Sequence, residues 1–237
     1  MRFAIIIPHY NHVGTLRRVA EGCLKKNPDV AIFDDGSAVS PAAQLAGLPV
    51  TLVRFNENRG KGAMLLEAAR WAANKGITHL VTLDADGQHR HQDYPSITRL
   101  SRSCSHAIII GKCKSIYHSF PFFTRFVQGI NRLLVRVETG KKLTDLCSGY
   151  RVYPVDLLLA LPLRCKRYTF ETEVLVKALW AGADVREREI HTVEPKNCIS
   201  HVRLLTDNLQ LLLLHFYLFF CALFPSSHKR YIPRKKK

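Results

Sequence analysis

Paired cysteines are missing from this sequence of 237 residues, although it contains seven cysteines. They are odd in number, dispersed along the chain and never spaced as Cys-x-x-Cys. Such a set is typical of reduced thiols, and it argues against a disulfide framework or a structural zinc site. The cysteines therefore indicate a protein of a reducing, cytoplasmic compartment.

Several other signals are missing as well. We expect no secretory signal peptide, because Pro8-His9 interrupts the first apolar run. No internal repeat precedes the C-terminal tail, and no stretch has the spacing of a Walker A loop. Acidic residues are few, since 19 Asp and Glu stand against 35 Lys and Arg, which gives a formal charge of +16. This excess indicates an anionic partner, such as an acidic membrane or a phosphorylated substrate.

Nucleic acid would also be an anionic partner, but the sequence argues against it. The positive residues are spread along the chain or gathered in the tail, with no recognised nucleic-acid motif and no aromatic–basic interleaving. We therefore expect no nucleic-acid partner.

Apolar residues make up 47% of the chain, which is enough for the core of one α/β domain. Apolar segments with the character of strands alternate with helix-like stretches, and the predicted strands are 2–7, 29–33, 50–55, 79–83 and 107–110. We expect the first to stop at Pro8. The alternation predicts a mostly parallel sheet flanked by helices. Ligands bind such sheets at the carboxyl ends of the strands, so polar residues there are candidates for a site.

Two carboxylates follow the predicted strand at 79–83, in the stretch from Thr82 to His89. Because residues i and i+2 of an extended chain point the same way, Asp84 and Asp86 are expected to face one cleft. Together with the Gln88 amide oxygen they are hard ligands that suit Mg²⁺ or Mn²⁺, with a phosphate supplying further oxygens. An aspartate at a strand end can also be only a turn or capping residue. Other polar strand ends nearby favour the metal site.

Two of these strand ends have more than one interpretation. Asp34-Asp35-Gly36-Ser37 is a good turn by composition, and it can also present a carboxylate to the base or ribose of a nucleotide. Gly60-Lys61-Gly62 opens a helix. It is either a flexible entry or a way to place backbone N–H groups and one ammonium against a phosphate.

Taken in order, these loops resemble the motifs of family 2 glycosyltransferases of GT-A fold. The nearest resemblance is to dolichyl- or polyprenyl-phosphate sugar transferases and small bacterial cell-envelope relatives. The matching stretches are Pro8-x-Tyr10-Asn11, Asp34-Asp35-Gly36-Ser37, Asn58-x-Gly60-Lys61-Gly62, Asp84-Ala85-Asp86-Gly87-Gln88-His89, Ser148-Gly149-Tyr150-Arg151, Phe170-Glu171-Thr172-Glu173 and Ser200-His201-x-Arg203. The resemblance implies an α/β, GT-A (Rossmann-like) fold with a mostly parallel sheet flanked by helices, over residues 1–205.

The resemblance also implies roles by position. The donor nucleotide sugar would be held by Pro8, Tyr10, Asp34, Asp35, Lys61, Asp84 and His201, and more weakly by His12, which stands where many relatives have glutamate. Asp84, Asp86 and Gln88 would hold Mg²⁺ or Mn²⁺ across the donor diphosphate. The residues with catalytic roles would be Glu171, Asp86 and Arg203.

The implied reaction is an inverting transfer from a UDP- or GDP-linked sugar to a lipid-linked acceptor, in cell-envelope glycan or glycolipid synthesis. Negative charge grows on the leaving diphosphate, and a metal and cations such as Arg203 stabilise it. A hydroxyl acceptor requires a general base, for which Glu171 is the first candidate and Glu173 the second. A phosphate acceptor is already an anion and needs no base. Glu171 can alternatively serve only the start of its helix.

An apolar run of 16 residues, 209–224, lies near the C-terminus, and six of the last nine residues are Lys or Arg. The run is marginal for a spanning helix, which needs about 20 apolar residues. We expect a membrane-interfacial helix at 206–225 and a basic tail at 226–237 that binds an anionic cytoplasmic leaflet. The alternative is a core or dimer-interface helix with a solvated tail. The segment 120–126 is a weaker candidate for a second membrane-facing element.

Two other function classes stay open. Nucleotidyl transfer also uses paired carboxylates and a metal, but the basic nucleotide loop expected early in such chains is absent. The other alternative is a catalytically inactive, glycosyltransferase-like protein that binds membranes.

Overall fold

The structure is a computed structural model that describes residues 1–12, 14–113, 122–165, 167, 169–193 and 204–223. Two predicted site residues, His201 and Arg203, lie outside the described residues. The predicted basic tail at 226–237 lies outside them as well.

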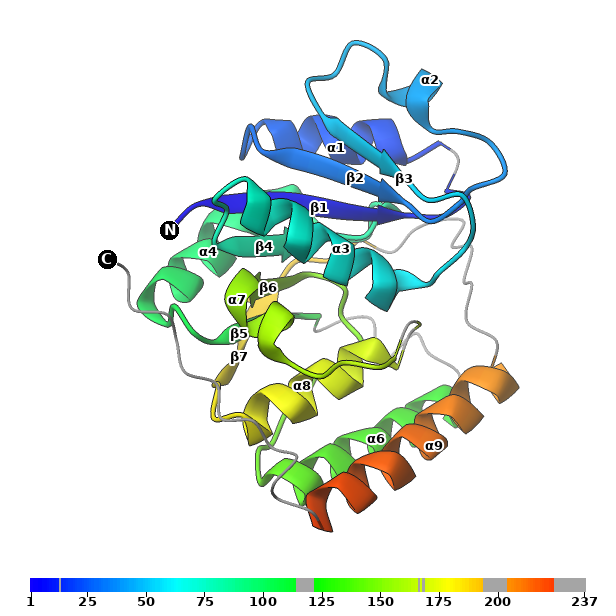
Figure 1. The fold of residues 1–237 in the computed structure, drawn as a ribbon, viewed down its shortest axis with the longest axis vertical. Helices are drawn as coiled ribbons and strands as arrows, with labels where there is room; N and C mark the ends of the chain where they lie inside the picture. Colours follow the sequence, from blue (N-terminus) through cyan, green and yellow to red (C-terminus); the bar gives the residue numbers. More distant parts are fainter. Residues whose placement is uncertain (13, 114–121, 166, 168, 194–203, 224–237) are drawn as a thin grey trace.

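A seven-stranded sheet with the order β3-β2-β1-β4-β6-β5-β7 runs through the molecule (Figure 1). The strands are β1 (Phe3–His9), β2 (Val30–Asp34), β3 (Thr51–Arg54), β4 (His79–Thr82), β5 (Ile108–Cys113), β6 (Arg151–Pro154) and β7 (Val185–Ile190). Only β6 runs antiparallel to its neighbours β4 and β5. The predicted mostly parallel sheet is therefore confirmed.

Helices cover both faces of the sheet (Figure 1). They are α1 (Leu16–Leu24), α2 (Ala42–Leu45), α3 (Lys61–Asn74), α4 (Tyr94–Ser103), α6 (Phe122–Thr139), α7 (Val155–Ala160), α8 (Phe170–Trp180) and α9 (Leu204–Leu223), with a short 3₁₀ turn η1 (His91–Asp93). Along β1, Ala4 and Ile6 enter one core with α3, α7 and α8, while Ile5 and Ile7 enter a second core with α1 and α4. Burial on both faces explains why β1, β2, β4 and β5 are mostly apolar, whereas β3 and β7 are more exposed.

The prediction that the first strand stops at Pro8 is wrong, because β1 continues through Pro8 to His9. Pro8 has no N–H to donate, and alternate residues of a strand direct their backbone groups to opposite neighbours. His9 bonds toward β2 through the N–H of Asp35, whereas Ile6 bonds toward β4 through the N–H of Leu83. The missing donor of Pro8 therefore faces the side on which β4 has already ended, and no ladder bond is lost.

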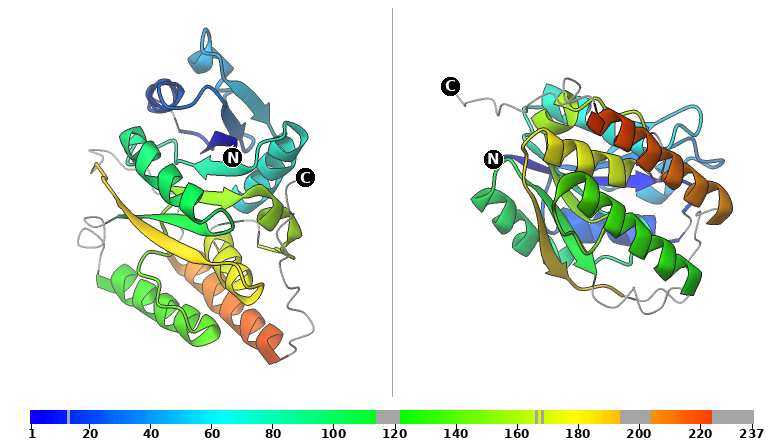
Figure 2. Two further views of the ribbon diagram at one scale, coloured as in Figure 1. Left: turned by 90° about the vertical axis from the view of Figure 1, so that its left-hand side faces the viewer. Right: turned by 90° about the horizontal axis from the view of Figure 1, so that it is seen from below.

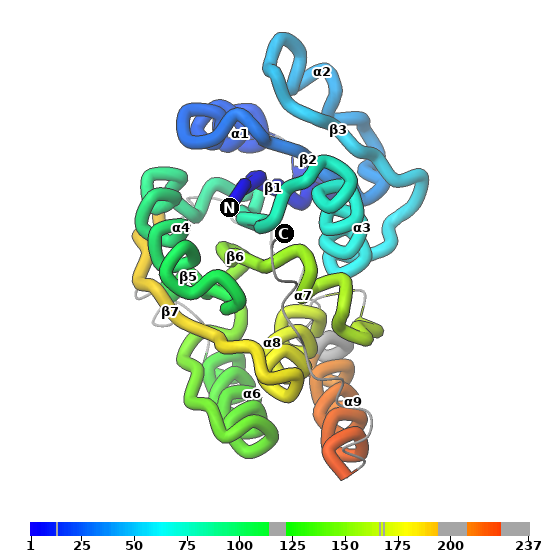
Figure 3. The backbone as a smooth tube through the Cα atoms, turned by 60° about the vertical axis from the view of Figure 1, so that its left-hand side comes forward, coloured from blue at the N-terminus to red at the C-terminus, as the bar shows by residue number. Residues whose placement is uncertain are grey.

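The helices α6 and α9 lie side by side on the far side of α8, away from the sheet (Figure 2). They form the end of the molecule opposite to α1 and α2 (Figure 3). The predicted apolar C-terminal helix is confirmed as α9, Leu204–Leu223. Within the described part of the chain, no helix is long and apolar enough to cross a bilayer.

Candidate active site

The candidate site lies where β2, β1 and β4 end side by side. In the register of the sheet, His9 at the end of β1 is opposite Asp34 at the end of β2, and Ile6 is opposite Thr82 at the end of β4. The loops after these strands are therefore brought to one edge, as the parallel topology predicts. The strand ends carry the predicted residues Pro8 and Asp34, and the loops that follow carry Tyr10, His12, Asp35, Asp84, Asp86 and Gln88.

The centre of this edge is an ion-pair cluster that joins β4, α3 and α8. The ammonium of Lys61, in the first turn of α3, lies 2.8 Å from Oδ1 of Asp84 and 3.0 Å from Oε1 of Glu171. Burial alone would lower the pKa of Lys61 and raise that of Asp84. Their mutual attraction outweighs burial, so the pKa of Lys61 is raised and the pKa of Asp84 is lowered. Both groups are therefore charged at neutral pH.

Glu171 is a buried carboxylate of which one oxygen has a partner in the described structure and the other has none. Its Oε1 pairs with Lys61, whereas its Oε2 is buried without a hydrogen-bond partner among the described residues. Glu173, two residues further along α8, points elsewhere. Oε1 of Glu173 lies 2.6 Å from the Lys177 ammonium, and Oε2 accepts hydrogen bonds from the backbone N–H groups of Arg164 and Cys165. Only Glu171 of the two acids therefore faces the site, as their i, i+2 spacing on a helix predicts.

Asp86 lies beside this cluster. Ala85 is buried in the core, whereas Asp84 and Asp86 on either side of it are partly exposed. The predicted extended geometry does not persist, because Ala85 and Asp86 lie in a turn, and this turn sets the direction of Asp86. Oδ1 of Asp86 accepts the N–H of Gln88 at 2.9 Å. Burial, and next the negative charge of Asp84, raise the pKa of Asp86.

The carboxylates of Asp84, Asp86 and Glu171 suit a divalent cation that is also held by substrate phosphates. No group of three or more His, Cys, Asp or Glu side chains in the described part of the chain is arranged to hold a metal on its own. Mg²⁺, however, is usually bound by one or two carboxylates together with substrate phosphates. Asp84 and Asp86 are two residues apart in the chain, and Glu171, with its unused Oε2, pairs with the same Lys61 as Asp84, so these carboxylates match that second arrangement.

The aspartates at the end of β2, Asp34 and Asp35, are both buried and have partners within the protein. Asp34 lies 2.8 Å from Nδ1 of His9 and 3.3 Å from Nε of Arg54. Asp35 accepts the backbone N–H groups of Arg59 and Gly60 at 2.7 and 2.8 Å. Asp35 therefore fixes the loop that delivers Lys61 to the site, and a contact with the nucleoside stays a prediction.

His89 also belongs to the site, at the end of the predicted stretch from Thr82 to His89, although the sequence assigned it no role. Its Nε2 lies 3.7 Å from Oδ2 of Asp84. Burial opposes protonation of His89, but hydrogen bonding and charge attraction to Asp84 outweigh it and raise its pKa to about 10. A second cation therefore lies against the aspartate that Lys61 already contacts.

The loop that leads into β6 presses against the same aspartate. A Cβ atom added to Gly149 would overlap the Asp84 carboxylate. The loop cannot easily retreat, because Thr82 donates to the Gly149 carbonyl at 2.6 Å and Asp145 accepts the N–H groups of Cys147 and Ser148. Gly149 is thus required by the close approach. Its place in the Ser-Gly-Tyr-Arg stretch was the only sequence signal for it.

Arg151 completes the support of this loop from the core. Its side chain is fully buried. The guanidinium donates to the backbone carbonyls of Leu146, Ser148 and Glu171 at 2.6, 2.8 and 2.9 Å. One buried cation therefore ties the Gly149 loop to the helix that carries Glu171.

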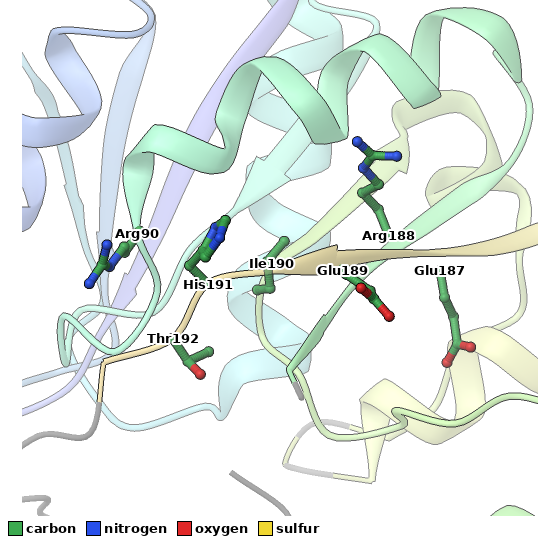
Figure 4. A pocket seen from close by; sticks show the side chains of 7 residues that line it. All are labelled: Arg90, Glu187, Arg188, Glu189, Ile190, His191 and Thr192. Atoms are coloured by element: carbon green, nitrogen blue, oxygen red, sulfur yellow. The ribbon is translucent and has the colours of Figure 1, made fainter. Parts of the chain in front are cut away.

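A cavity of about 720 Å³ lies elsewhere, along the edge strand β7 (Figure 4). Its lining residues are Arg90, Glu187, Arg188, Glu189, Ile190, His191 and Thr192. Acidic and basic side chains alternate there, and His191 is paired with Asp93. None of the predicted site residues that the structure describes lines this cavity. The convergence of charged groups at the strand ends, and not this cavity, therefore marks the candidate site.

Comparisons with known proteins identify a family. The model of the family described as "Glycosyl transferase family 2" matches residues 4–161. An undecaprenyl-phosphate mannosyltransferase of Micrococcus luteus is 28% identical over 211 residues, which cover 82% of this chain and 84% of that protein. A polyprenol monophosphomannose synthase of Mycolicibacterium smegmatis is 24% identical over 214 residues, covering 84% and 80% of the two chains.

Solved structures support the fold. Glucosyl-3-phosphoglycerate synthase from Mycobacterium tuberculosis, in complex with phosphoglyceric acid, superimposes with a TM-score of 0.72 at 16% sequence identity. The match covers 92% of this chain and 79% of that one. A complex of the same enzyme with Mn²⁺, uridine diphosphate and phosphoglyceric acid gives a TM-score of 0.71 at 14% identity. The predicted GT-A type of fold is thus confirmed.

Proposed function

The chain belongs to glycosyl transferase family 2 and is a glycosyltransferase, and we propose that it moves a hexose from a nucleotide-diphosphate sugar to a polyprenyl phosphate. The relatives named above act on undecaprenyl phosphate and on polyprenol phosphate by their names, which supports this class of acceptor. The place of the reaction would be the cytoplasmic face of a membrane, in cell-envelope glycan or glycolipid synthesis. The inverting outcome remains part of the proposal.

The observation that carries the proposal is the cluster of Asp84, Asp86, Lys61 and Glu171 at the ends of the parallel strands. Glycosyl transfer from a nucleotide diphosphate separates a leaving diphosphate anion from a sugar with cationic character. Carboxylates suit the sugar side of that charge separation, and Lys61 and His89 offer positive charge to the diphosphate side. Because these groups are held by α3, β4 and α8, they are positioned before any substrate arrives.

Asp84, Asp86 and Gln88 would hold Mg²⁺ or Mn²⁺ at this site, which would bridge and neutralise the donor diphosphate. Solved neighbours crystallised with Mn²⁺ or Mg²⁺ and uridine diphosphate support a divalent ion in the fold. Lys61 already pairs with one oxygen of Asp84. We infer that Lys61 keeps Asp84 ionised and oriented, and that its ammonium also lies within reach of a donor phosphate.

The donor nucleoside is proposed to bind across the ends of β1 and β2. Pro8, Tyr10 and His12 supply the first loop, and Asp34 and Asp35 hold that loop and its neighbour in place. The proposed contributions of His201 and Arg203 to the leaving diphosphate concern residues outside the described part of the chain.

A direct test of the proposed function is a screen of the purified chain with UDP- and GDP-linked sugars. We expect one donor to be hydrolysed slowly in the presence of Mn²⁺ or Mg²⁺, and transfer to begin when a short-chain polyprenyl phosphate is added. Chelation of the metal should stop both reactions, and its return should restore them. Absence of binding and hydrolysis for every donor and metal would contradict the proposal and favour the inactive, membrane-binding alternative.

The acceptor class predicts a small effect for Glu171→Gln. A phosphate acceptor is already an anion, so loss of the carboxylate should lower kcat by less than about tenfold, whereas loss of a general base costs roughly 10²–10⁴-fold. The measurement is kcat with a polyprenyl phosphate at saturating donor. Glu173→Gln is the contrasting variant, because it removes the carboxylate that pairs with the buried Lys177 ammonium and should lower the melting temperature. A loss of a hundredfold or more in Glu171→Gln would contradict this expectation and show that Glu171 acts in the reaction, either as a base or through its pairing with Lys61.

Membrane association is proposed to follow from the C-terminal part of the chain. The helix α9 leaves Leu209, Leu213, Phe216 and Phe220 about half exposed or more. The net charge of +16 favours an anionic lipid surface. Since α9 is not apolar and long enough to span a bilayer, peripheral attachment is the proposed mode.

A further inference from the structure

We propose that α6 and α9 together form one lipid-docking face, in which α6 supplies about half of the surface that enters the membrane interface. The inference deepens the proposed function, because it concerns how a lipid-linked acceptor would meet the site. It rests on the arrangement of side chains on two helices that are distant in sequence and adjacent in space (Figure 2).

The helix α6 exposes its apolar side. Its exposed apolar residues are Phe122, Phe123, Phe126, Ile130, Leu133 and Val137, with exposed fractions from 41% to 83%. Successive steps of three or four residues place them within an arc of roughly 100° on the helix surface. A stripe of this kind normally faces the core of a soluble protein. Here it faces outward.

The helix α9 repeats this pattern. Its outward residues include Leu209, Leu212, Phe216, Phe220 and Leu223, with exposed fractions from 49% to 60%. The residues that it buries, Leu214, His215 and Leu218, lie on the opposite side of the helix. Both helices therefore turn a continuous apolar stripe away from the body of the protein. A contiguous exposed surface of this kind marks an interaction site, whereas scattered apolar residues do not.

Polar side chains, in contrast, are placed between the helices. Nδ1 of His215 lies 2.8 Å from Oε1 of Glu138, and its Nε2 lies 2.9 Å from Oδ1 of Asn131. Asn131 in turn donates to Oγ1 of Thr172 on α8 at 3.4 Å. These groups are buried. The inner sides of the two helices hold this polar network beside the core residues Val135, Leu214 and Leu218, so the helices are anchored while their apolar stripes face outward.

The positive charge beside the apolar stripe favours an anionic lipid surface, and not a second copy of this chain, as the partner of this face. Arg125, Arg132 and Arg136 follow each other at steps of seven and four residues, which places them in a row along one border of the α6 stripe. The exposed Arg125 and Arg136 can reach anionic headgroups while the apolar residues beside them enter the acyl boundary, whereas Arg132 is partly buried and donates to the Thr144 carbonyl at 3.4 Å. A second copy would instead bring another chain of charge +16 against this one.

The test compares two triple variants by flotation with vesicles of phosphatidylglycerol and phosphatidylcholine. Phe126→Ser, Ile130→Ser and Leu133→Ser change α6, and Leu213→Ser, Phe216→Ser and Phe220→Ser change α9. Because each removes three outward apolar side chains, each should lower vesicle partitioning by at least about tenfold. The matched control, Val39→Ser with Leu159→Ser, changes exposed apolar residues on other elements and should partition like the unaltered protein.

Wild-type partitioning in the α6 variant would overturn the proposal, because α9 and the tail would then suffice. It would also be overturned if the unaltered protein did not float, or if the variants only converted a dimer to a monomer in sedimentation. Circular dichroism verifies that both variants fold. Donor hydrolysis in vesicle-free buffer is measured in parallel. Hydrolysis without flotation would contradict the docking face alone, and flotation without hydrolysis would contradict the proposed enzymatic function alone.

Discussion

Replacing Asp86 by alanine is expected to lower metal-dependent donor hydrolysis by at least about a hundredfold. Asp86 and Asp84 are close enough that the charge of one raises the pKa of the other. Lys61 and His89 both contact Asp84, whereas the hydrogen bond that Asp86 accepts from Gln88 comes from a neutral backbone group. Because Lys61 and His89 already neutralise much of the charge of Asp84, a cation bound by the two carboxylates would depend mainly on the negative charge of Asp86.

The measurement is hydrolysis of the donor identified in the screen, together with the binding of Mn²⁺ alone followed by electron paramagnetic resonance. Both signals should fall in Asp86→Ala. The control is Asp156→Ala, at the start of α7, where the carboxylate meets only the N–H of Leu157 among its hydrogen bonds in the described structure. Undiminished hydrolysis in Asp86→Ala would mean that the Asp84–Asp86 pair is a structural strand end and holds no metal.

A second large effect is expected for Gly149→Ala, which adds a single methyl group. The new Cβ would lie closer to the Asp84 carboxylate than side chains tolerate. Because Thr82, Asp145 and Arg151 hold the loop, the movable partner is the Asp84 side chain. Its displacement would separate it from Lys61 and from Asp86. We expect donor hydrolysis to fall by about a hundredfold or more, since misplaced charge in a preorganised site loses most of its effect.

The stability of Gly149→Ala is expected to change far less than its activity. The clash is with the end of a partly exposed side chain and not with the backbone, so the core can remain intact. Thermal unfolding and donor hydrolysis are measured on the same preparation. Gly129→Ala on α6, where an added Cβ meets no atom within 4 Å, is the matched control and should keep full hydrolysis. Full activity in Gly149→Ala would contradict the role of this close approach.

Local patterns in the sequence were sufficient for β1 to β5 and for part of the site, whereas β6 and β7 were not predicted. Continuous apolar runs predicted β1, β2, β4 and β5 because these strands are buried on both faces. The parallel topology then predicted that the loops carrying Asp34, Asp84 and Asp86 would meet at one edge. The i, i+2 spacing also predicted correctly that Glu171 and Glu173 would point in different directions.

One local inference failed where a neighbouring strand decided the outcome. Pro8 normally interrupts a central strand, but β4 ends before the position where its missing N–H would matter. The composition of a turn at Asp34-Asp35 did not by itself predict how deeply the two carboxylates are buried. In the structure both carboxylates are buried, because His9, Arg54 and the N–H groups before α3 surround them.

The α/β fold, the strand-end aspartates and the apolar C-terminal helix could thus be inferred from local sequence, since each depends on residues close together along the chain. The folded arrangement was needed to find that Lys61 lies between Asp84 and Glu171, that Gly149 approaches Asp84 closely, and that α6 and α9 turn their apolar sides outward. These contacts join segments far apart in sequence. Their geometry is set by how the helices pack on the sheet, and no periodicity within one segment carries that information.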